Sequence, residues 1–420
     1  MNQSPSPAEE FPSRLSGQRI AGQHDSDSPP QEQSPKATPS GTEVSTGSAA
    51  TPPSSTSDSY SICQVTRKAM ATEFVILLPS LDSDHSRTTP SHRHRSDTEV
   101  DVLGSPDLNS PDLNSPGAAV EAAVEAADLL EGIEADLTIY RPTSEISRIN
   151  LLAGETPVVV SESTFSLLQR AVYWGAQTGG AFDVTAGPLV EAWGFTQRSG
   201  KKPTAQEIKK ACDCVGYQHL RLAPADRSVA FAVPGMAINL GGIGKGDALD
   251  RLAKHLRSRG VRDFLIHGGN SSVIASGDQT PGSGLGWAVG LAHPTKPNRR
   301  LAGIWLRDQA LATSGSGKQF FHHQGRRYGH VIDPRTGYPA GDLLSLTLLM
   351  DHAADADALA TGLFVSGSEA VRDQFQQQQI SAALMVHRGI KQDSASLETL
   401  GDFHWIDPPE SIPPTDFAGR

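Results

Sequence analysis

Strand-like segments alternate with amphipathic helical segments over most of the chain, and this alternation limits the fold more than any other feature. The first strand-like run covers residues 66–79 and is rich in β-branched and aliphatic residues. Apolar residues at mainly helical spacing follow at residues 118–135 and again at 162–179, where two glycines end the segment. Strands mixed with helices of about ten residues or more predict an α/β (α+β) fold.

The same alternation continues to residue 387. Ser144 is a suitable N-cap for a short helix after the turn at residues 140–142, and residues 219–240 alternate as expected for a hairpin. Further strands are predicted at residues 262–275, 285–292, 301–312, 343–350 and 381–387. Further helices are predicted at residues 201–215, 241–255, 353–365 and 368–378.

Three regions contain too few large apolar residues to form a packed core. Residues 1–59 are mainly Ser, Pro, Thr, Gln, Glu and Asp, and we expect a disordered tail because burial there cannot offset the entropy of ordering. Residues 80–116 predict a disordered insertion, and residues 409–420 predict a flexible C-terminal tail. One domain therefore remains at residues 60–408. The insertion contains three histidines that we interpret as solvated: His85, His92 and His94.

Charge and composition exclude several classes of protein. The formal net charge of −11 argues against a general nucleic-acid binder and against a protein that binds anionic membranes. The chain has no apolar run of about 20 residues and no charged-then-apolar segment at Met1, so we expect no transmembrane segment and a cytoplasmic location. Three cysteines in a chain of this length do not make a disulfide framework.

A stretch at residues 312–339 combines small hydroxyl residues, cations and one histidine. Pro334 and Gly337 mark a tight turn, and His330 precedes it at the end of a strand-like run. A histidine at such a place can exchange protons near neutral pH, or it can flank a turn without any chemistry. The hydroxyl residues and cations of this stretch are Thr313, Ser314, Ser316, Lys318, Arg326 and Arg327.

The glycine-rich run at residues 241–246 opens a predicted helix and contains Lys245. Backbone N–H groups ahead of a helix can hold phosphate, which is one interpretation. A Walker A loop is excluded because Asn239 stands where its first glycine belongs and Gly246 replaces the Ser or Thr after the lysine. The other interpretation is a tight strand-to-helix turn with a solvated lysine.

Two further groups of residues leave alternatives open. On a helix, Asp357 and Thr361 lie on the same face, where a carboxylate and a hydroxyl suit a hard cation such as Mg²⁺. Alternatively, Thr361 bonds back to its own helix and Asp357 is a solvated acid. The aromatic residues Phe182, Trp193 and Phe195 around Asp183 could stack on a planar ring or belong to the core.

Taken together, these segments resemble the ApbE family, the FAD:protein FMN transferases. The matching segments follow one another in the order of the family. They are MAT at 70–72, IYRPTSEISRIN at 139–150, GAFDVTAGPLVEAWGF at 180–195, NLGGIGKG at 239–246, GGN at 268–270, ATSGSG at 312–317, HVIDPRTGYP at 330–339 and ADALATGLFV at 356–365. Any one segment is only modestly specific, but all eight in order are strong support for the resemblance.

The resemblance implies an ApbE (T-fold-like) flavin transferase fold, with mixed sheets and flanking helices, that holds FAD in a cleft. It assigns Mg²⁺ to Asp357, Thr361 and the backbone carbonyl of Gly242. It assigns His330 as the general base near the phosphates. The residues that it assigns to FAD are Met70, Tyr140, Ala181, Phe182, Asp183, Asn239 and Lys245.

The implied reaction is a Mg²⁺-dependent transfer of FMN from FAD to a Thr or Ser hydroxyl, with AMP as leaving group. The implied partner is an acceptor flavoprotein subunit of a respiratory or redox complex. Water in place of the hydroxyl would make the chain an FAD pyrophosphatase. The remaining alternatives are an FAD-binding protein without turnover and a metal-dependent phosphoesterase that binds no flavin.

Several positions depart from the family's pattern. Ala71 replaces the glycine of M-G-T, which we expect to matter little because alanine is small. Asn239 and Asn270 stand in place of aspartates, whereas Asp247 replaces a typical aromatic and adds negative charge near the phosphates. We expect these changes to alter metal affinity and turnover but not the fold. No lipobox precedes Cys63, so the family's periplasmic, membrane-associated location remains only an alternative.

Overall fold

The structure is a computed structural model that describes residues 43–47, 60–81, 116–296, 298–315, 317, 320–340, 342–388 and 395–409. These residues all belong to one compact unit that begins after Pro39. Strand β1 (Glu43–Gly47) lies within the predicted tail and pairs with β2 (Tyr60–Ala69). Most of the predicted insertion lies outside the described residues, as do Ser316, Lys318 and the three histidines His85, His92 and His94.

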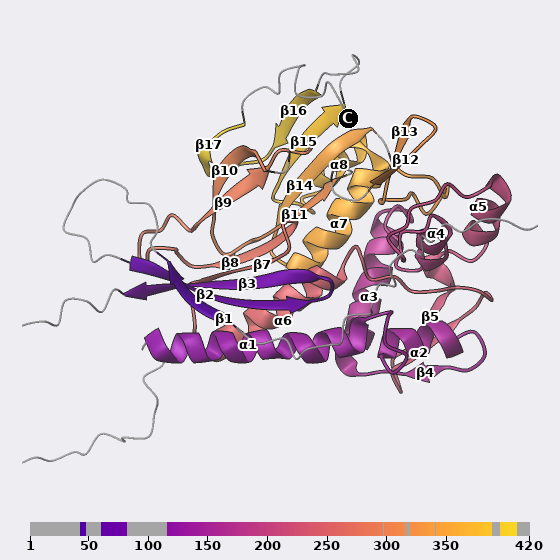
Figure 1. Cartoon of the computed structure of the whole chain (residues 1–420), viewed down its shortest axis with the longest axis horizontal. Coiled ribbons are helices and arrows are strands. Elements are labelled where there is room, and N and C mark those ends of the chain that lie inside the picture. The colour runs from indigo at the N-terminus through magenta and orange to yellow at the C-terminus, as the bar shows by residue number, and fades with distance from the viewer. Residues whose placement is uncertain are drawn as a thin grey trace, which may run out of the picture. The chain divides into compact units, whose positions relative to one another are not determined.

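The main sheet has nine strands among the described residues, and each neighbouring pair in it is antiparallel. Their spatial order is β1-β2-β3-β7-β8-β11-β14-β15-β16 (Figure 1). The other strands of this sheet are β3 (Thr72–Leu81), β7 (Phe264–Gly268), β8 (Ser272–Ser276), β11 (Ala310–Gly315), β14 (Leu343–Met350), β15 (Ala382–Arg388) and β16 (Ala395–Leu400). Every residue of β14 is buried, which places this strand at the centre of the core.

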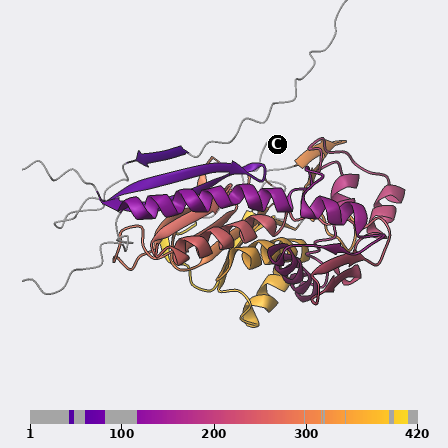
Figure 2. The same ribbon diagram turned by 90° about the horizontal axis from the view of Figure 1, so that it is seen from below.

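Helices cover one face of the main sheet, and a smaller sheet covers the other. Helices α1 (Pro116–Leu137), α6 (Gly244–Ser258) and α7 (Ala353–Ser366) pack on the first face, as Figures 1 and 2 show. The second face packs against a three-stranded sheet in the order β17-β10-β9. Its strands are β9 (Trp287–Ala292), β10 (Arg300–Leu306) and β17 (Trp405–Asp407).

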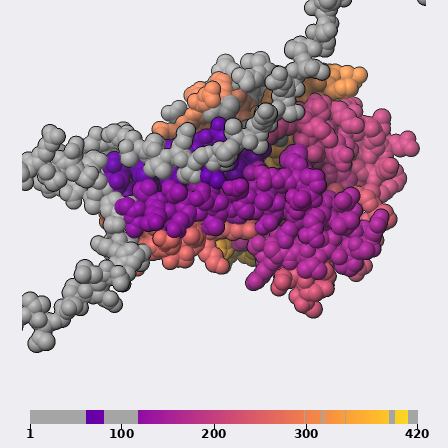
Figure 3. Space-filling model, turned by 60° about the horizontal axis from the view of Figure 1, so that its bottom comes forward, coloured from indigo at the N-terminus to yellow at the C-terminus, as the bar shows by residue number. Residues whose placement is uncertain are grey.

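The alternation of side chains along β7 explains how one strand serves both cores. Phe264 and Ile266 belong to the helix-side core, whereas Leu265 between them belongs to the core under the small sheet. In the space-filling view of Figure 3, α1 forms a continuous band across one face of the molecule. None of the described helices is long and apolar enough to cross a membrane.

Shorter elements form the part of the unit next to the end of α7. A two-stranded hairpin, β12 (Phe320–His323) with β13 (Arg326–Gly329), packs its aromatic rings on Trp193. The remaining elements are α2 (Glu145–Leu152), β4 (Val158–Val159), α3 (Glu162–Gln177), α4 (Gly187–Ala192), α5 (Ala205–Cys212), the 3₁₀ turn Tyr217–His219, β5 (Leu220–Ala223), β6 (Ser228–Phe231) and α8 (Ser368–Gln376).

Several predicted strands are wrong in their extent. The run at 66–79 is a hairpin, because the chain reverses at Met70 and Ala71, where no Gly or Pro signals a turn. The run at 262–275 divides into β7 and β8, and the run at 301–312 divides into β10 and β11 of two different sheets. The hairpin predicted at 219–240 ends at Phe231. Apolar patterns mark strands but not the turns between them.

Candidate active site

A cleft of about 1020 Å³ opens beside the N-terminal end of α6. This volume is at the upper end of the range for small-molecule sites. The β2–β3 turn, the segment after α3, the middle of α7 and the segment after β13 contribute to its wall. All of the residues predicted for FAD, Mg²⁺ and the base line this cleft: Met70, Tyr140, Ala181, Phe182, Asp183, Asn239, Gly242, Lys245, His330, Asp357 and Thr361.

The first turn of α6 lies directly against the first turn of α7. A Cβ atom on Gly246 would lie 2.2 Å from the carbonyl oxygen of Ala353, so only glycine fits at this position. The Gly246 N–H donates a hydrogen bond of 2.8 Å to Oδ2 of Asp357. The glycine that excludes a Walker A loop is therefore required by the contact between two helices.

Asp357 is a buried carboxylate surrounded by hydrogen-bond donors, not a solvated acid. Its side chain is 7% exposed. Oδ1 accepts a hydrogen bond of 2.6 Å from Ser272 Oγ, and Oδ2 lies 3.6 Å from Nζ of Lys245. Two hydrogen-bond donors and one cation therefore surround the carboxylate, which lines the cleft.

Thr361 lies one helical turn after Asp357 and has two polar neighbours. Its hydroxyl donates to the Asp357 carbonyl oxygen at 2.9 Å, as one of the two interpretations predicted, and also lies 3.3 Å from Ser314 Oγ. A Cβ atom on Gly242 would lie 3.2 Å from Thr361 Oγ1, so the loop before α6 lies next to the Thr361 hydroxyl group.

These oxygen atoms are the kind of ligands that a hard cation prefers. The residues that would hold Mg²⁺ therefore fit it by their chemistry: the Asp357 carboxylate, the Thr361 hydroxyl and the Gly242 carbonyl. Over the described parts of the chain, no three His, Cys, Asp or Glu side chains form a metal-binding group. A cation site here would thus depend on one carboxylate together with hydroxyl and carbonyl oxygens.

The segment after α3 brings an apolar wall and an acid to the cleft. Ala181 and Phe182 are buried, and both residues are part of the cleft wall. Asp183 is also buried, which raises the pKa of its carboxyl group. Its oxygens accept hydrogen bonds from Thr185 and from the Tyr217 N–H at 2.8 Å, so this carboxylate fixes the local loop.

Two aromatic residues of this region differ in their surroundings. Trp193 is fully buried and donates from Nε1 to the Gly337 carbonyl oxygen at 2.8 Å, so it is a core residue that anchors the turn after His330. Tyr140 is 66% exposed, and its hydroxyl group donates to the Thr196 carbonyl oxygen at 3.1 Å. Of the two, only Tyr140 lines the cleft.

Met70 and Ala71 form the two-residue turn between β2 and β3. Their φ angles are +51° and +59°, as a type I′ hairpin turn requires at both positions. The Met70 N–H donates to Oε1 of Glu134 at 2.9 Å, which ties the turn to α1. The expectation that alanine at position 71 matters little is wrong, because a left-handed φ favours glycine over any residue with a Cβ atom.

The remaining departures from the family's pattern lie in different places. Asn239 and Asn270 line the cleft, and Oδ1 of Asn239 accepts the Gly241 N–H at 2.9 Å. The expectation that Asp247 adds charge near the phosphates is wrong. Its side chain lies away from the cleft lining and pairs with Nε of Arg251 at 2.8 Å. Burial raises the pKa of Asp247 to about 6.

His330 follows β13 and lines the cleft. Its ring centre lies 6.4 Å from that of Phe195, in an edge-on arrangement. The turn after it is closed by the Gly337 N–H, which donates to the Asp333 carbonyl oxygen at 2.8 Å. The nearby cations Arg326 and Arg327 lie over the rings of Tyr328 and Phe320 and do not line the cleft.

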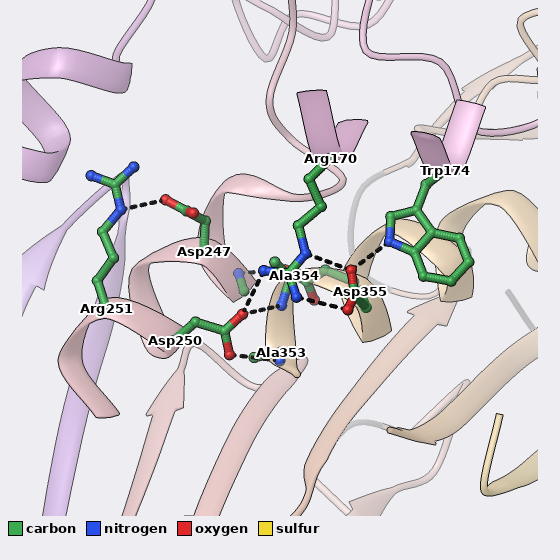
Figure 4. A network of polar contacts seen from close by, with 10 residues as sticks. Arg170, Trp174, Asp247, Asp250, Arg251, Ala353, Ala354 and Asp355 are labelled. Carbon is green, nitrogen blue, oxygen red and sulfur yellow. Dashed lines mark hydrogen bonds and ion pairs between the residues drawn. The ribbon is translucent and has the colours of Figure 1, made fainter. Parts of the chain in front are cut away.

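A partly buried polar network fixes α7 against α6 and α3 (Figure 4). Asp250 of α6 accepts the N–H groups of Ala353 and Ala354 at 2.8 and 3.1 Å, and so caps the start of α7 from a neighbouring helix. Arg170 of α3 bridges Asp250 and Asp355, at 3.2 Å and 2.7 Å. Asp355 therefore points away from Asp357, as helical spacing predicts.

Sequence reasoning missed Ser272, which orients Asp357, and Asp250, which caps α7. These contacts join residues 85 and 103 positions apart. No local pattern marks such a pair. The only indication for Ser272 in the sequence was weak: it lies two residues after the GGN segment, directly after Ser271.

The ApbE family matches this chain over residues 98–385. An FAD:protein FMN transferase of Treponema pallidum is 36% identical over 266 residues, which cover 60% of this chain and 73% of that protein. An FAD:protein FMN transferase of Vibrio cholerae is 33% identical over 245 residues, which cover 57% of this chain and 72% of that protein.

Solved structures show the same fold. The ApbE protein of Thermotoga maritima superposes with a TM-score of 0.63 at 28% identity, over 80% of this chain and 96% of that chain. The flavin transferase ApbE of Vibrio cholerae gives a TM-score of 0.63 at 26% identity, over 86% of this chain and 97% of that chain. The predicted α/β fold is thereby confirmed. The chain belongs to the ApbE family.

Proposed function

We propose that this chain transfers FMN from FAD to a Thr or Ser hydroxyl of an acceptor flavoprotein in a respiratory or redox complex, with AMP as leaving group. One observation carries the proposal. Eleven residues assigned from separate sequence motifs converge on one cleft, in a chain whose relatives are named FAD:protein FMN transferases.

The anionic pyrophosphate of FAD would lie at the N-terminal end of α6. Lys245 provides a positive charge there, beside the buried Asp357 carboxylate. The Asp357, Thr361 and Gly242 oxygens would hold Mg²⁺, which when bound supplies positive charge that neutralises the phosphates. The buried side chains of Ala181 and Phe182 would form an apolar wall beside this polar end.

His330 would accept the proton of the acceptor hydroxyl. The hydroxyl oxygen then forms a bond with the FMN phosphorus, the bond from that phosphorus to the bridging oxygen breaks, and AMP leaves with the electron pair. The products are an FMN phosphoester on the acceptor, AMP and one proton on the base. A histidine suits this role because it exchanges protons near neutral pH.

The proposal is tested by incubating the purified chain with FAD and Mg²⁺, with and without EDTA, and separating the nucleotides by chromatography. We expect AMP to form only when Mg²⁺ and an acceptor flavoprotein domain are both present. AMP together with free FMN in the absence of an acceptor would instead make the chain an FAD pyrophosphatase. FAD that binds and stays intact under all conditions would leave a flavin-binding protein without turnover.

A further inference from the structure

The cleft extends beyond the predicted phosphate site onto the small sheet. The residues from Ala288 to Ala292, which make up all of β9 except Trp287, line it. In the described part of the chain, β9 is an edge strand, since β10 is its only neighbour in the order β17-β10-β9. An edge strand presents backbone groups that can pair with another chain.

The hydrogen bonds around β9 show which backbone groups point outward. The Ala288 N–H donates to Oε1 of Gln279 at 3.2 Å, on the side away from β10. Trp305 of β10 is the residue paired with Ala288. The Trp305 N–H donates to the His404 carbonyl oxygen on the opposite side of β10. Because backbone direction alternates along a strand, Gly290 and Ala292 also direct their N–H and C=O groups away from β10.

The side chains of β9 leave this edge accessible. Trp287 and Leu291 are buried in the core under the small sheet and hold the strand in place. Ala288, Gly290 and Ala292, between and beside them, are exposed and small. The strand has none of the features that usually protect an edge, such as an exposed lysine, a proline or an inward-pointing charge.

The C-terminal end of β9 leads to the predicted cation site. A Cβ atom on Gly317 would lie 2.3 Å from the carbonyl oxygen of Pro294, two residues after β9. Gly317 follows Ser314 by three residues, and Ser314 Oγ lies 3.3 Å from Thr361 Oγ1. A chain that pairs with β9 would therefore run along the cleft towards Thr361.

We propose that β9 is the docking strand for the acceptor protein, and that an extended acceptor segment carrying the Thr or Ser pairs with the outward backbone groups of Gly290 and Ala292. This inference rests on the proposed transferase function and names how its protein substrate is held. Main-chain pairing supplies affinity with little dependence on sequence, and the adjoining cavity selects the side chains. Such pairing would present one hydroxyl to the reacting phosphorus.

The first test replaces Gly290 by proline, which removes the outward N–H of this residue. An edge strand tolerates proline at a position whose N–H points away from the neighbouring strand. Transfer to an acceptor domain is measured with Gly290→Ala as the matched control, because alanine keeps the N–H. We expect the KM for the acceptor to rise about tenfold in Gly290→Pro, since the main-chain hydrogen bond donated by residue 290 is lost. The affinity for FAD, measured by flavin fluorescence, stays at the wild-type value and shows that the variant is folded.

The second test uses a short synthetic peptide around the modified residue of that acceptor, methylated at one backbone nitrogen at a time. Strand pairing predicts that methylation at every second residue abolishes modification, while methylation at the residues between has little effect. Loss without this two-residue period would overturn the inference, as would an unchanged KM in Gly290→Pro. A third outcome would also overturn the inference: the wild type is a dimer, and Gly290→Pro is a monomer with an unchanged KM. In that case β9 would pair with a second copy of the chain.

The two proposals fail in different ways. A wild-type chain that modifies no acceptor but cleaves or merely binds FAD contradicts the transferase function itself. A wild-type chain that modifies its acceptor with equal efficiency in the Gly290→Pro variant contradicts only the role of β9.

Discussion

The environment of Asp357 is the most informative feature at the level of single residues. A buried carboxylate is stable only where donors or cations compensate for the loss of water, and here Ser272, Gly246 and Lys245 do so. Of these three residues, Lys245 lines the cleft together with Asp357. The site is therefore arranged around one negative charge on α7, whose position is set by groups from two other elements, α6 and β8.

Replacing Asp357 by alanine or asparagine should lower activity and Mg²⁺ dependence together. We expect a loss of about 100-fold or more, because the carboxylate is the one charged ligand among the proposed oxygen donors. The measurement is AMP formation as a function of Mg²⁺ concentration. Asp351→Asn, at an exposed position at the end of β14, is the matched control and should behave like the wild type. Full activity in Asp357→Asn would remove this residue from the site.

The conformation of Ala71 predicts a stabilising substitution. Its φ of +59° disfavours a residue with a Cβ atom, so Ala71→Gly should raise the free energy of unfolding by about 1 kcal/mol. Ala69→Gly, two residues earlier within β2, should lower it by about 0.5–1 kcal/mol because its backbone is ordinary strand. Thermal unfolding of the three proteins checks both directions. Equal destabilisation by the two glycines would contradict the assigned turn.

The position of His330 predicts a split between binding and catalysis. His330→Ala should slow transfer by about 100-fold or more, since a general base typically contributes this much. The dissociation constant for FAD should change little, because in the proposed function the apolar wall and the α6 end would hold the flavin. Single-turnover transfer and flavin fluorescence measure the two quantities separately. A variant that loses FAD binding would make His330 a ligand-holding residue instead.

At the level of elements, the junction of α6 and α7 positions the candidate site. The first turn of α7 has no side-chain cap of its own, and Asp250 of α6 accepts its N–H groups instead. Gly246 allows the two helices to touch. This arrangement keeps Lys245 on one helix within 3.6 Å of Asp357 on the other.

Asp247 in this junction predicts a pH-dependent effect on stability. Its pKa in the folded state is raised, chiefly by burial, from 3.8 to about 6. A carboxyl group with a raised pKa contributes stability below about pH 4, and this contribution is lost as the pH rises through about 6. Asp247→Asn mimics the protonated form and should therefore be more stable than the wild type at pH 7.5 by about 1–3 kcal/mol.

Urea unfolding of Asp247→Asn and the wild type at pH 4 and pH 7.5 measures this effect. The difference should disappear at pH 4, where the wild-type carboxyl group is protonated in the folded state. A variant that is less stable at both values would show that the ion pair with Arg251 outweighs the cost of burial.

Sequence patterns located most helices, and the resemblance to the ApbE family indicated the cleft residues, but neither indicated the contacts between elements. Helical spacing identified α3 and α6, each of which buries one stripe of side chains, and the predicted helix at residues 353–365 is α7, which is buried on almost every side. The reversal at Met70 and Ala71 escaped prediction because positive φ is unusual for these residues. Asp250 and Ser272 escaped it because their partners are distant in sequence, and position in space alone brings them together.

At the level of the described unit, the two faces of the main sheet contribute different parts of the cleft wall. The helix side supplies Lys245, Asp357 and Thr361, and the small sheet supplies the edge strand β9. A two-substrate reaction needs this division, since FAD and the acceptor must approach one phosphorus from different directions. We therefore propose that the helical end binds the nucleotide and that the strand edge binds the acceptor protein.

The most direct test of this account is the intact mass of an acceptor flavoprotein domain after incubation with the chain, FAD and Mg²⁺. We predict a mass gain of one FMN phosphoester, matched by an equal amount of AMP, and no gain when EDTA is present or when the acceptor residue is replaced by valine. An acceptor of unchanged mass alongside released AMP and free FMN would contradict the transferase and make water the acceptor.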